Sequence, residues 1–249
     1  MTKPLIGILT GISYVSGLDY YESINRLVTA DSKVGDIMSP NPDIVMVSVD
    51  CDRYVHFLTE RLFAEVDEHL LGGVAKIANA GCDVLVIASN TGHICVPAVR
   101  NAFPHLDIIH IADCAAAEIK QSKLSKVGLI GTQATMEEEY LKSRLALHNI
   151  DTVIPESPDD RSRIYDIICQ ELSFNVLRDG SRDFMIDVIR GMQSQGAEAC
   201  LLGCTEIELL VKQDDIQDVH LLPSAQIHIA GVVDILLGRR KLGNLLPGT

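Results

Sequence analysis

One of the seven cysteines, Cys204, lies directly after an apolar run and is followed by Thr205 and Glu206. A thiol at the turn from a buried strand into a helix lies near the helix N-terminus, whose partial positive charge lowers a thiol pKa. We therefore expect Cys204 to be partly ionised and to act as a base or nucleophile on a small carboxylate substrate. Thr205 and the main-chain N–H groups after it are expected to bind a carboxylate oxygen. The alternative is a thiol that only packs between strand and helix, as we expect for Cys200.

The segment that carries Cys204 repeats an earlier one. Residues 81–91 (GCDVLVIASNT) align without a gap with residues 196–206 (GAEACLLGCTE). Each reads as a glycine, an acidic residue, a buried strand and a small polar residue. Upstream of each, at a similar distance, the segments 6–11 and 127–132 also match. Two similar half-chains predict two pseudo-symmetric lobes.

The repeat makes Ser89 the counterpart of Cys204. Ligands of such sheets bind at the carboxyl ends of the strands, so we expect the two residues to face each other across one cleft. The run of Ser89, Asn90 and Thr91 offers two hydroxyls, an amide and a helix N-terminus, which suit a carboxylate or an ammonium group. A purely architectural repeat, with Asn90 or Thr91 as a helix cap, is the alternative.

Short apolar runs alternate along the chain with segments of helical period, which predicts parallel sheets covered by helices on both faces. The fold class is therefore α/β, with two lobes that each hold a parallel sheet flanked by helices and an active site in the cleft between them. The first lobe is expected to span residues 1–112, completed by 217–249, and the second 113–216. The predicted strands are 6–9, 44–49, 84–88, 108–111, 127–130, 199–202 and 219–222, and the predicted helices 16–31, 54–79, 93–103, 113–122, 135–148, 161–178, 181–194, 204–212 and 225–238.

Charge and cysteine usage exclude several classes of protein. The net charge is −13, and no cluster of Lys or Arg stands out, so we expect no nucleic-acid partner. No apolar run approaches transmembrane length, so no membrane partner is expected. The seven cysteines are odd in number and lack C-x-x-C spacing, which argues against a disulfide scaffold or a zinc ribbon and for reduced thiols in the cytoplasm. We expect no metal, and interpret Cys82 and Cys169, like Cys200, as core residues.

Several runs together resemble the aspartate/glutamate racemase family of the Asp/Glu/hydantoin racemase superfamily. The resemblance covers most of the chain, and three runs, 88–93, 127–136 and 202–207, are specific as a set. The matching runs are Gly7–Tyr14 with Tyr20 and Tyr21, Ser48–Asp50, Ala88–His93, Val127–Met136 and Leu202–Ile207.

The resemblance implies a cofactor-independent enzyme, and usually a homodimer, that inverts an amino acid with two acid/base residues. One residue removes the Cα proton from one face and the other delivers a proton to the opposite face, with Cys204 and Ser89 at the two catalytic positions. Charge that moves onto the substrate carboxylate must be stabilised. By analogy, the substrate-binding residues are Ser13, Ser48, Asn90, Thr91, Thr132, Thr135 and Thr205.

The sequence departs from the family pattern at positions that bear on activity and substrate. Ser89 stands where the family usually has cysteine, and a hydroxyl is a much poorer base than a thiol near neutral pH. We therefore expect weak or one-sided proton exchange. Ser173 stands where members that act on aspartate often carry lysine, and residues 223–228 depart from the usual Asp-Thr-Thr pattern. Arg53 is a candidate cation for a second substrate carboxylate, with a solvated surface residue as the alternative.

Two alternatives to a racemase remain open from the sequence. One is a decarboxylase or isomerase of the same superfamily that uses a single cysteine to protonate an enediolate from one side. The other is a non-catalytic sensor of amino acids or dicarboxylates, for which a thiol at position 204 would be unnecessary. A dinucleotide-binding enzyme is excluded, because Gly7–Gly11 lacks the Gly-x-Gly-x-x-Gly spacing, and a P-loop is absent.

Overall fold

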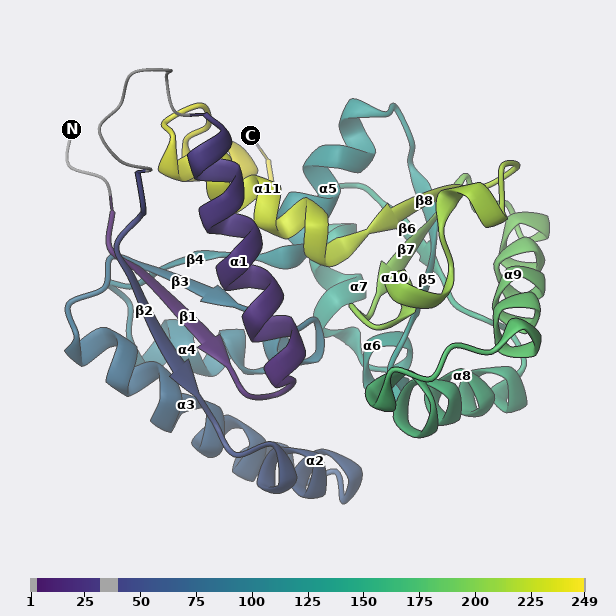
Figure 1. Ribbon diagram of the computed structural model, residues 1–249, viewed down its shortest axis with the longest axis horizontal. Coiled ribbons are helices and arrows are strands. Elements are labelled where there is room, and N and C mark those ends of the chain that lie inside the picture. The colour runs from purple at the N-terminus through teal and green to yellow at the C-terminus, as the bar shows by residue number, and fades with distance from the viewer. Residues whose placement is uncertain (1–3, 32–39, 249) are drawn as a thin grey trace. The chain divides into compact units, whose positions relative to one another are not determined.

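The structure is a computed structural model of the 249-residue chain and describes residues 4–31 and 40–248. Within these residues the strands form two four-stranded sheets, with all recorded strand pairs parallel, in the orders β2-β1-β3-β4 and β6-β5-β7-β8. The two orders are the same when each half of the chain is numbered from its own first strand. The α/β fold with two lobes that the sequence predicts is therefore confirmed (Figure 1).

The chain divides into two compact units, each of which holds one sheet. The first comprises Met1–His110 and His228–Asn244, and the second Ile111–Ile227 and Leu245–Thr249, less the residues that the structure does not describe. This differs from the boundary expected at residue 217. The strand at 220–223 hydrogen-bonds to β7, so it belongs to the second sheet.

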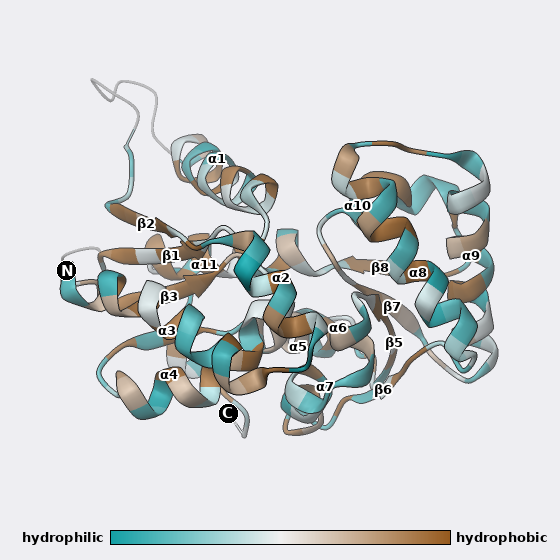
Figure 2. Ribbon diagram, turned by 90° about the horizontal axis from the view of Figure 1, so that it is seen from below, coloured by the Kyte–Doolittle hydropathy of each residue, from teal (hydrophilic) through white to brown (hydrophobic). Residues whose placement is uncertain are grey.

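In the first unit, the strands alternate with helices on both faces of the sheet. The helix α3 packs against β1 and β2, while α1 lies on the other side of the sheet in both ribbon views (Figures 1 and 2). The strands are brown in Figure 2, as expected for a sheet that is buried on both faces. The elements are β1 (Ile6–Thr10), α1 (Tyr14–Ala30), β2 (Ile44–Ser48), α2 (Cys51–Thr59), α3 (Phe63–Asn79), β3 (Val84–Ile87), the 3₁₀ helix η1 (Thr91–Cys95), α4 (Val96–Ala102) and β4 (Asp107–Ile109). Most of α11 (Ser224–Leu236) and of the short helix η4 (Leu242–Leu245) also belongs to this unit, while the first residues of α11 and the last of η4 lie in the second.

In the second unit, alternate residues of the strands separate two apolar clusters. Leu129 and Leu201 pack with α5 and α7, whereas Ile130 and Leu202 pack with α8, α9 and α10. This is the alternation that a strand buried on both faces requires. The elements are α5 (Ile111–Gln121), β5 (Lys126–Gly131), α6 (Gln133–Glu137), α7 (Glu139–Ala146), β6 (Asp151–Val153), α8 (Pro158–Gln170), η2 (Leu172–Phe174), α9 (Asp179–Ser194), β7 (Ala199–Gly203), α10 (Ile207–Leu210), η3 (Gln213–Asp215) and β8 (His220–Pro223).

The acidic residue of the repeat has the same structural role in both units. Asp83 accepts a hydrogen bond from the main chain of Leu5 at 2.9 Å, just before the first strand of its sheet. Glu198 accepts from the main-chain N–H groups of Ser125 and Lys126 at 2.7 and 2.9 Å, at the start of β5. These hydrogen bonds lower the pKa of Glu198. The two carboxylates therefore fix the register of corresponding strand pairs.

Three long predicted helices are interrupted in the structure. The segment 54–79 breaks at Arg61, whose φ of 55° is left-handed and ends α2 before α3 begins. Thr132 caps α6 and Glu138 separates α6 from α7 within 135–148. The third, 161–178, ends as α8 and continues as the short η2, after which Asn175 has a φ of 56°. The three-residue strand β6 was missed, because so short a run has no detectable period.

Candidate active site

In each unit, the predicted site residues lie at or shortly after the carboxyl ends of the strands. In the first unit, Ser13 follows β1, Ser48 ends β2, and Ser89 follows β3 within two residues. In the second unit, Thr132 follows β5 and Cys204 follows β7 directly. Because the strands of each sheet are parallel, these ends share one edge of their own sheet, the edge at which α/β proteins bind ligands.

Ser89 is held by the short helix that follows it. Its Oγ atom accepts a hydrogen bond from the main-chain N–H of Gly92 at 3.2 Å, and its carbonyl oxygen lies 2.7 Å from Nδ1 of His93. The side chain is half-buried, while Asn90 and Thr91 are each 5% exposed. A hydroxyl oxygen that already accepts a hydrogen bond is better placed to donate its proton than to take one.

Three other predicted residues of the first unit lie at the ends of helices or strands. Ser13 caps α1, since its Oγ accepts from the N–H of Ser16 at 3.4 Å. Ser48 is exposed at the end of β2. Arg53 is exposed on the first turn of α2, and its guanidinium lies 5.7 Å from the centre of the Phe57 ring. Ser13 and Arg53 lie at the starts of helices and Ser48 at the end of a strand, and a substrate role for the three stays a prediction.

Cys204 is paired with a carboxylate. Its thiol donates a hydrogen bond to Oε2 of Glu206 at 3.0 Å, and the same oxygen accepts from the hydroxyl of Thr205 at 2.7 Å. Cys204 is 8% exposed, and Thr205 and Glu206 are half-buried. The hydroxyl proton of Thr205 is therefore donated to Glu206.

The thiol of Cys204 is held in its protonated form, contrary to the expectation of partial ionisation. Burial raises its pKa well above the ordinary value, and the negative charge of Glu206 and the hydrogen bond to it raise the pKa further. The main-chain N–H groups of Glu206 and Ile207 lower the pKa by less. The physical reason is that α10 has four residues, too few for a strong helix dipole, while a carboxylate stands beside the sulfur.

Thr132 and Thr135 form a hydrogen-bonded chain with Tyr140. The two threonine hydroxyls lie 3.0 Å apart, and Thr135 Oγ1 lies 3.0 Å from Tyr140 Oη. Thr135 is completely buried, and its methyl group fills the space beside Gly131 and Gly203 at the ends of β5 and β7. Thr135 is therefore placed to support Thr132, which is half-buried at the start of α6.

The residue that the sequence prediction left out of the site is Glu206. The available signal was the spacing of a carboxylate two residues after the thiol, which a tight turn brings within hydrogen-bond distance. A strand-to-helix turn has that geometry, so the spacing could have identified the pair.

The seven cysteines are all free, as expected. Cys82 and Cys200 are buried, while Cys169 is only partly buried on α8. Burial raises the pKa of Cys200, and the pKa of Cys95 is raised to about 12, first by burial. Across the described ranges, no group of three or more His, Cys, Asp or Glu side chains is placed to hold a metal ion.

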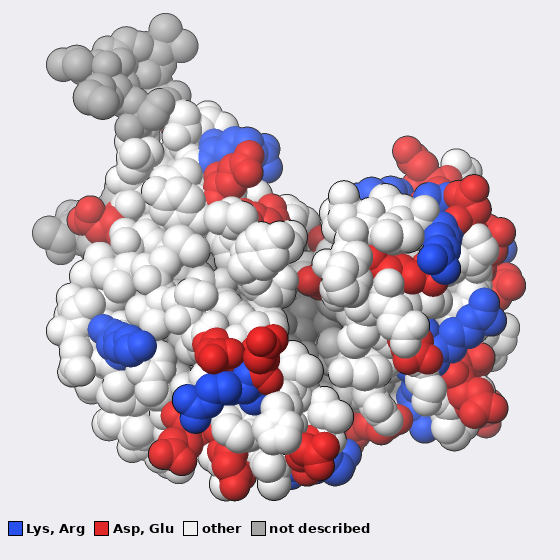
Figure 3. Space-filling view, turned by 60° about the horizontal axis from the view of Figure 1, so that its bottom comes forward, with Lys and Arg blue, Asp and Glu red and all other residues white. Residues whose placement is uncertain are grey.

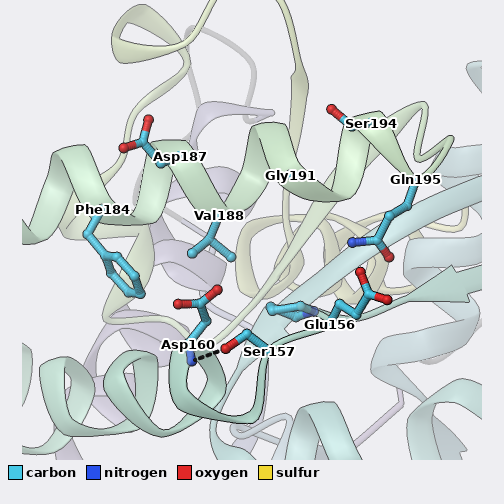
Figure 4. A pocket seen from close by; sticks show the side chains of 10 residues that line it. Glu156, Ser157, Asp160, Phe184, Asp187, Val188, Gly191, Ser194 and Gln195 are labelled. Carbon is cyan, nitrogen blue, oxygen red and sulfur yellow. Dashed lines mark hydrogen bonds between the residues drawn. The ribbon is translucent and has the colours of Figure 1, made fainter.

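A cavity of about 710 Å³ lies elsewhere, between the start of α8 and the second half of α9. Figure 4 shows the carboxylates of Glu156 and Asp160 between the two helices, with Phe184 at one end, while the carboxylate of Asp187 points away from that space. Carboxylates repel an acidic ligand, so this cavity does not suit a carboxylate substrate. None of the predicted site residues, all of which the structure describes, lines it.

Surface charge is mixed on the face that Figure 3 shows. Lys and Arg side chains stand singly or in small groups among Asp and Glu. Among the helices within residues 4–31 and 40–248, there is none with the length and apolar character to cross a membrane.

The sequence matches that of known proteins over most of its length. It matches the Asp/Glu/Hydantoin racemase family over residues 9–232. It is 28% identical over 108 residues, 43% of this chain and 70% of the other, to an uncharacterized protein of Pectobacterium carotovorum subsp. carotovorum.

Solved structures show the same fold. A candidate Asp/Glu racemase from Yersinia pestis superposes with a TM-score of 0.83 at 31% identity, covering 94% of this chain and 99% of the other. An aspartate racemase homologue from Pyrococcus horikoshii OT3 gives a TM-score of 0.77 at 25% identity, with 94% and 99% covered. The glutamate racemase of Francisella tularensis, solved with D-glutamate, shares the fold alone, with a TM-score of 0.66 at 17% identity and 99% and 84% covered. The chain therefore belongs to the Asp/Glu/Hydantoin racemase family.

Proposed function

We propose that the protein is a cofactor-independent amino-acid racemase of the aspartate/glutamate type, in which proton exchange on one face of Cα is faster than inversion. The observation that carries the proposal is the 3.0 Å hydrogen bond from the Cys204 thiol to the Glu206 carboxylate. A buried thiol needs no such partner to pack in a core. A thiol that must give and take a proton does need a base within reach.

The pair accounts for proton transfer on one face of the substrate. The Sγ–H bond breaks as its proton passes to Glu206 Oε2, and the resulting thiolate takes the proton from Cα. The electron pair of the Cα–H bond moves into the carboxylate group of the substrate to give an enediolate. Reversal of these steps returns a proton to the same face and retains configuration.

Inversion needs a proton from the opposite face, which we assign to Ser89. Its hydroxyl would donate to Cα, and the alkoxide left behind would have to be reprotonated by water. An alkoxide is costly near neutral pH, because the hydroxyl is a weak acid and the N–H of Gly92 is one neutral hydrogen-bond donor. We therefore infer slow inversion beside faster exchange with retention.

Substrate binding is assigned to the polar groups at the same strand ends. Asn90, Thr91 and Thr132 and the main-chain N–H groups at these turns offer donors for an amino-acid carboxylate. Donors that strengthen as charge develops on the carboxylate lower the barrier to loss of the Cα proton. Arg53, with Ser13 and Ser48, stays the proposed contact for a second substrate carboxylate, which would make aspartate or glutamate the preferred substrate.

Incubation in D₂O tests this function. The protein is mixed with each enantiomer of aspartate, glutamate and a panel of other amino acids, and loss of the Cα–H signal is followed by NMR together with chiral chromatography. We expect Cα–H loss to be faster than loss of enantiomeric purity. Absence of exchange with every amino acid would disprove the racemase, and binding without exchange would indicate a sensor instead.

A second function is favoured by the protonated state of Cys204. A decarboxylase that uses one cysteine needs a thiol as proton donor, a form that burial and Glu206 maintain here, and needs no base at position 89. Such an enzyme releases CO₂ from an α-substituted malonate and protonates the enediolate from one side. Release of CO₂ with a single product enantiomer, without amino-acid exchange, would establish this function.

We further infer a cytoplasmic homodimer. Seven free thiols suit a reducing compartment. The helix α1 exposes an apolar stripe at helical spacing, with Tyr14 73%, Leu18 61% and Tyr21 49% exposed, which a second copy could cover. Light scattering should then give twice the chain mass of 27.2 kDa, and a mass of one chain would contradict the dimer.

A further inference from the structure

Three histidines pack together inside the first unit. His93, His110 and His228 are 1%, 3% and 0% exposed. The ring of His93 lies 4.6 Å from that of His110 and 5.7 Å from that of His228, centre to centre. The three come from η1, from the residue after β4 and from α11, so the cluster joins segments far apart in the sequence.

Hydrogen bonds to carbonyl oxygens fix the tautomers of two of these rings. Nε2 of His228 lies 2.9 Å from the carbonyl of Ile109, and Nδ1 of His93 lies 2.7 Å from the carbonyl of Ser89. A carbonyl only accepts, so these nitrogens carry the protons. Nδ1 of His228 then accepts from the hydroxyl of Tyr20 at 2.8 Å.

The ring of His93 is shielded from water. Burial, together with a smaller contribution from the neighbouring His228, lowers the pKa of His93 to about 3. His93 is therefore a neutral donor at any pH at which the protein would work. A buried polar ring costs free energy unless its hydrogen bonds are made, so a ring that only filled space would be better replaced by an apolar residue.

The hydrogen bond of His93 ends at the main chain of the proposed catalytic serine. Gly92 holds the Ser89 side chain and His93 holds its carbonyl, so two consecutive residues fix the orientation of that turn. We propose that His93 is a positioning residue for Ser89, and that His110, His228 and Tyr20 hold its ring in place. The inference rests on the proposed function for its meaning in the reaction, whereas the geometry of the turn can be tested without activity.

A thiol introduced by Ser89→Cys reports on the turn. The N–H of Gly92 would stabilise its thiolate and hold its pKa down. Alkylation of that thiol is followed against pH by mass spectrometry of the peptide, with the exposed Cys51 of the same unit as the internal reference. Two second-site variants are compared: His93→Leu removes the donor, and His93→Asn keeps an amide N–H near the position of Nδ1.

We expect His93→Leu to move the alkylation profile of the introduced thiol to higher pH, to slow its reaction about tenfold at a fixed pH, and to leave Cys51 unchanged. His93→Asn should restore most of the difference. The inference would be overturned if the two second-site variants gave the same alkylation profile, if neither profile differed from that of the Ser89→Cys protein, or if the profile of Cys51 shifted in parallel.

NMR of the imidazole nitrogens in the unsubstituted protein keeps the inference testable if His93→Leu does not fold. His93 should show the Nδ1–H tautomer and no titration between pH 5.5 and 8.5. The Nε2–H tautomer, or titration at an ordinary histidine pKa, would overturn the inference.

Activity assays separate the positioning inference from the proposed function. In the Ser89→Cys protein, His93→Leu should lower inversion while exchange with retention at Cys204 stays the same. If no variant exchanges any amino acid but the alkylation results are as expected, the proposed function fails and the positioning of the turn stands.

Discussion

The two strand ends that the repeat makes equivalent are held by different chemistry. At the end of β3, the Ser89 hydroxyl accepts a main-chain hydrogen bond from Gly92, and its carbonyl is held by a neutral imidazole. At the end of β7, Cys204 donates to the carboxylate of Glu206. One turn is thus built from neutral dipoles, and the other from a thiol next to a negative charge.

The difference shows which repeated positions carry architecture and which carry chemistry. Asp83 and Glu198 accept main-chain hydrogen bonds at the starts of corresponding strands, and Gly7 and Gly128 admit corresponding helices. These roles are the same in both units. The residues after the strands have diverged, so the fold is symmetric while the proposed proton transfer is one-sided.

Removal of the Cys204 thiol should have the largest effect on Cα–H exchange of any change at the two strand ends. Cys204→Ser replaces the group proposed to give and take the Cα proton by a hydroxyl, which is a far weaker acid and base. We expect exchange of Cα–H in D₂O to fall by roughly 10³-fold or more. As the control, Cys200→Ala removes a buried thiol on β7, the strand that leads to Cys204, and should leave the rate per folded molecule nearly unchanged. Retained exchange in Cys204→Ser would contradict the assignment.

Removal of the carboxylate should separate two roles of Glu206. In Glu206→Gln the negative charge that raises the pKa of Cys204 is absent, so alkylation of Cys204 should occur at lower pH than in the parent. The proton acceptor is also absent, so Cα–H exchange should fall by about 10²-fold. An unchanged or raised alkylation midpoint would show that Glu206 does not control the thiol.

The burial of His93 beside the Ser89 turn predicts a loss of stability at acidic pH. The pKa of His93 is about 3 in the folded protein and close to 6.5 when unfolded. The unfolded chain therefore binds more protons between these values, so stability is complete above about pH 6.5 and falls as the pH decreases. From pH 6.5 to 4.5 the loss at His93 should be roughly 2 to 3 kcal/mol, measured by urea unfolding.

His93→Asn is the matched control for this pH dependence. Asparagine does not titrate in this range, so the dependence should flatten by about the same amount. The surface carboxylates Glu198 and Asp218 have lowered pKa values, so their own contributions are lost only at still lower pH. A slope that persists in His93→Asn would show that another group is responsible.

A thiol introduced at position 89 should make the ends of β3 and β7 chemically more alike. Ser89→Cys supplies a better acid and base for the second face, so the ratio of inversion to exchange with retention should rise about tenfold. Chiral chromatography beside the D₂O experiment measures both rates in one sample. No gain would show that the position, not the hydroxyl, limits inversion.

The sequence predicts those features of the structure that depend on local interactions. The buried runs that form seven of the eight described strands, and the repeat of residues 81–91 at 196–206, depend on pattern alone, so the sequence predicts them. The protonation of Cys204 depends first on its burial and then on the charge of Glu206. The spacing of Glu206 is visible in the sequence, but the burial of the thiol and the shortness of α10 are set by the folded chain. The histidine cluster joins residues 93, 110 and 228, so it becomes visible only when the chain is folded.

The packing of a helix against a strand glycine, which the two units share, can be tested with one substitution in each unit. A Cβ added at Gly7 would lie 2.0 Å from Cγ2 of Ile77 on α3, whereas at Gly128 it would lie 3.0 Å from the terminal methyl of Met192 on α9. Isoleucine is stiff at χ1 and can yield only by leaving its rotamer, while methionine moves its end group freely. Gly7→Ala should therefore lower the free energy of unfolding by about 1 kcal/mol, and Gly128→Ala should change it little.

Ile77→Ala, which removes the clashing Cγ2, tests the cause of that difference. If the contact with Ile77 is responsible, Ile77→Ala together with Gly7→Ala should cost less than the sum of the two single changes in urea unfolding. Equal costs at Gly7 and Gly128 would mean that the helices of the two units adjust alike. The structural equivalence of the units would then extend to their energetics, and the asymmetry of the molecule would be confined to the two turns.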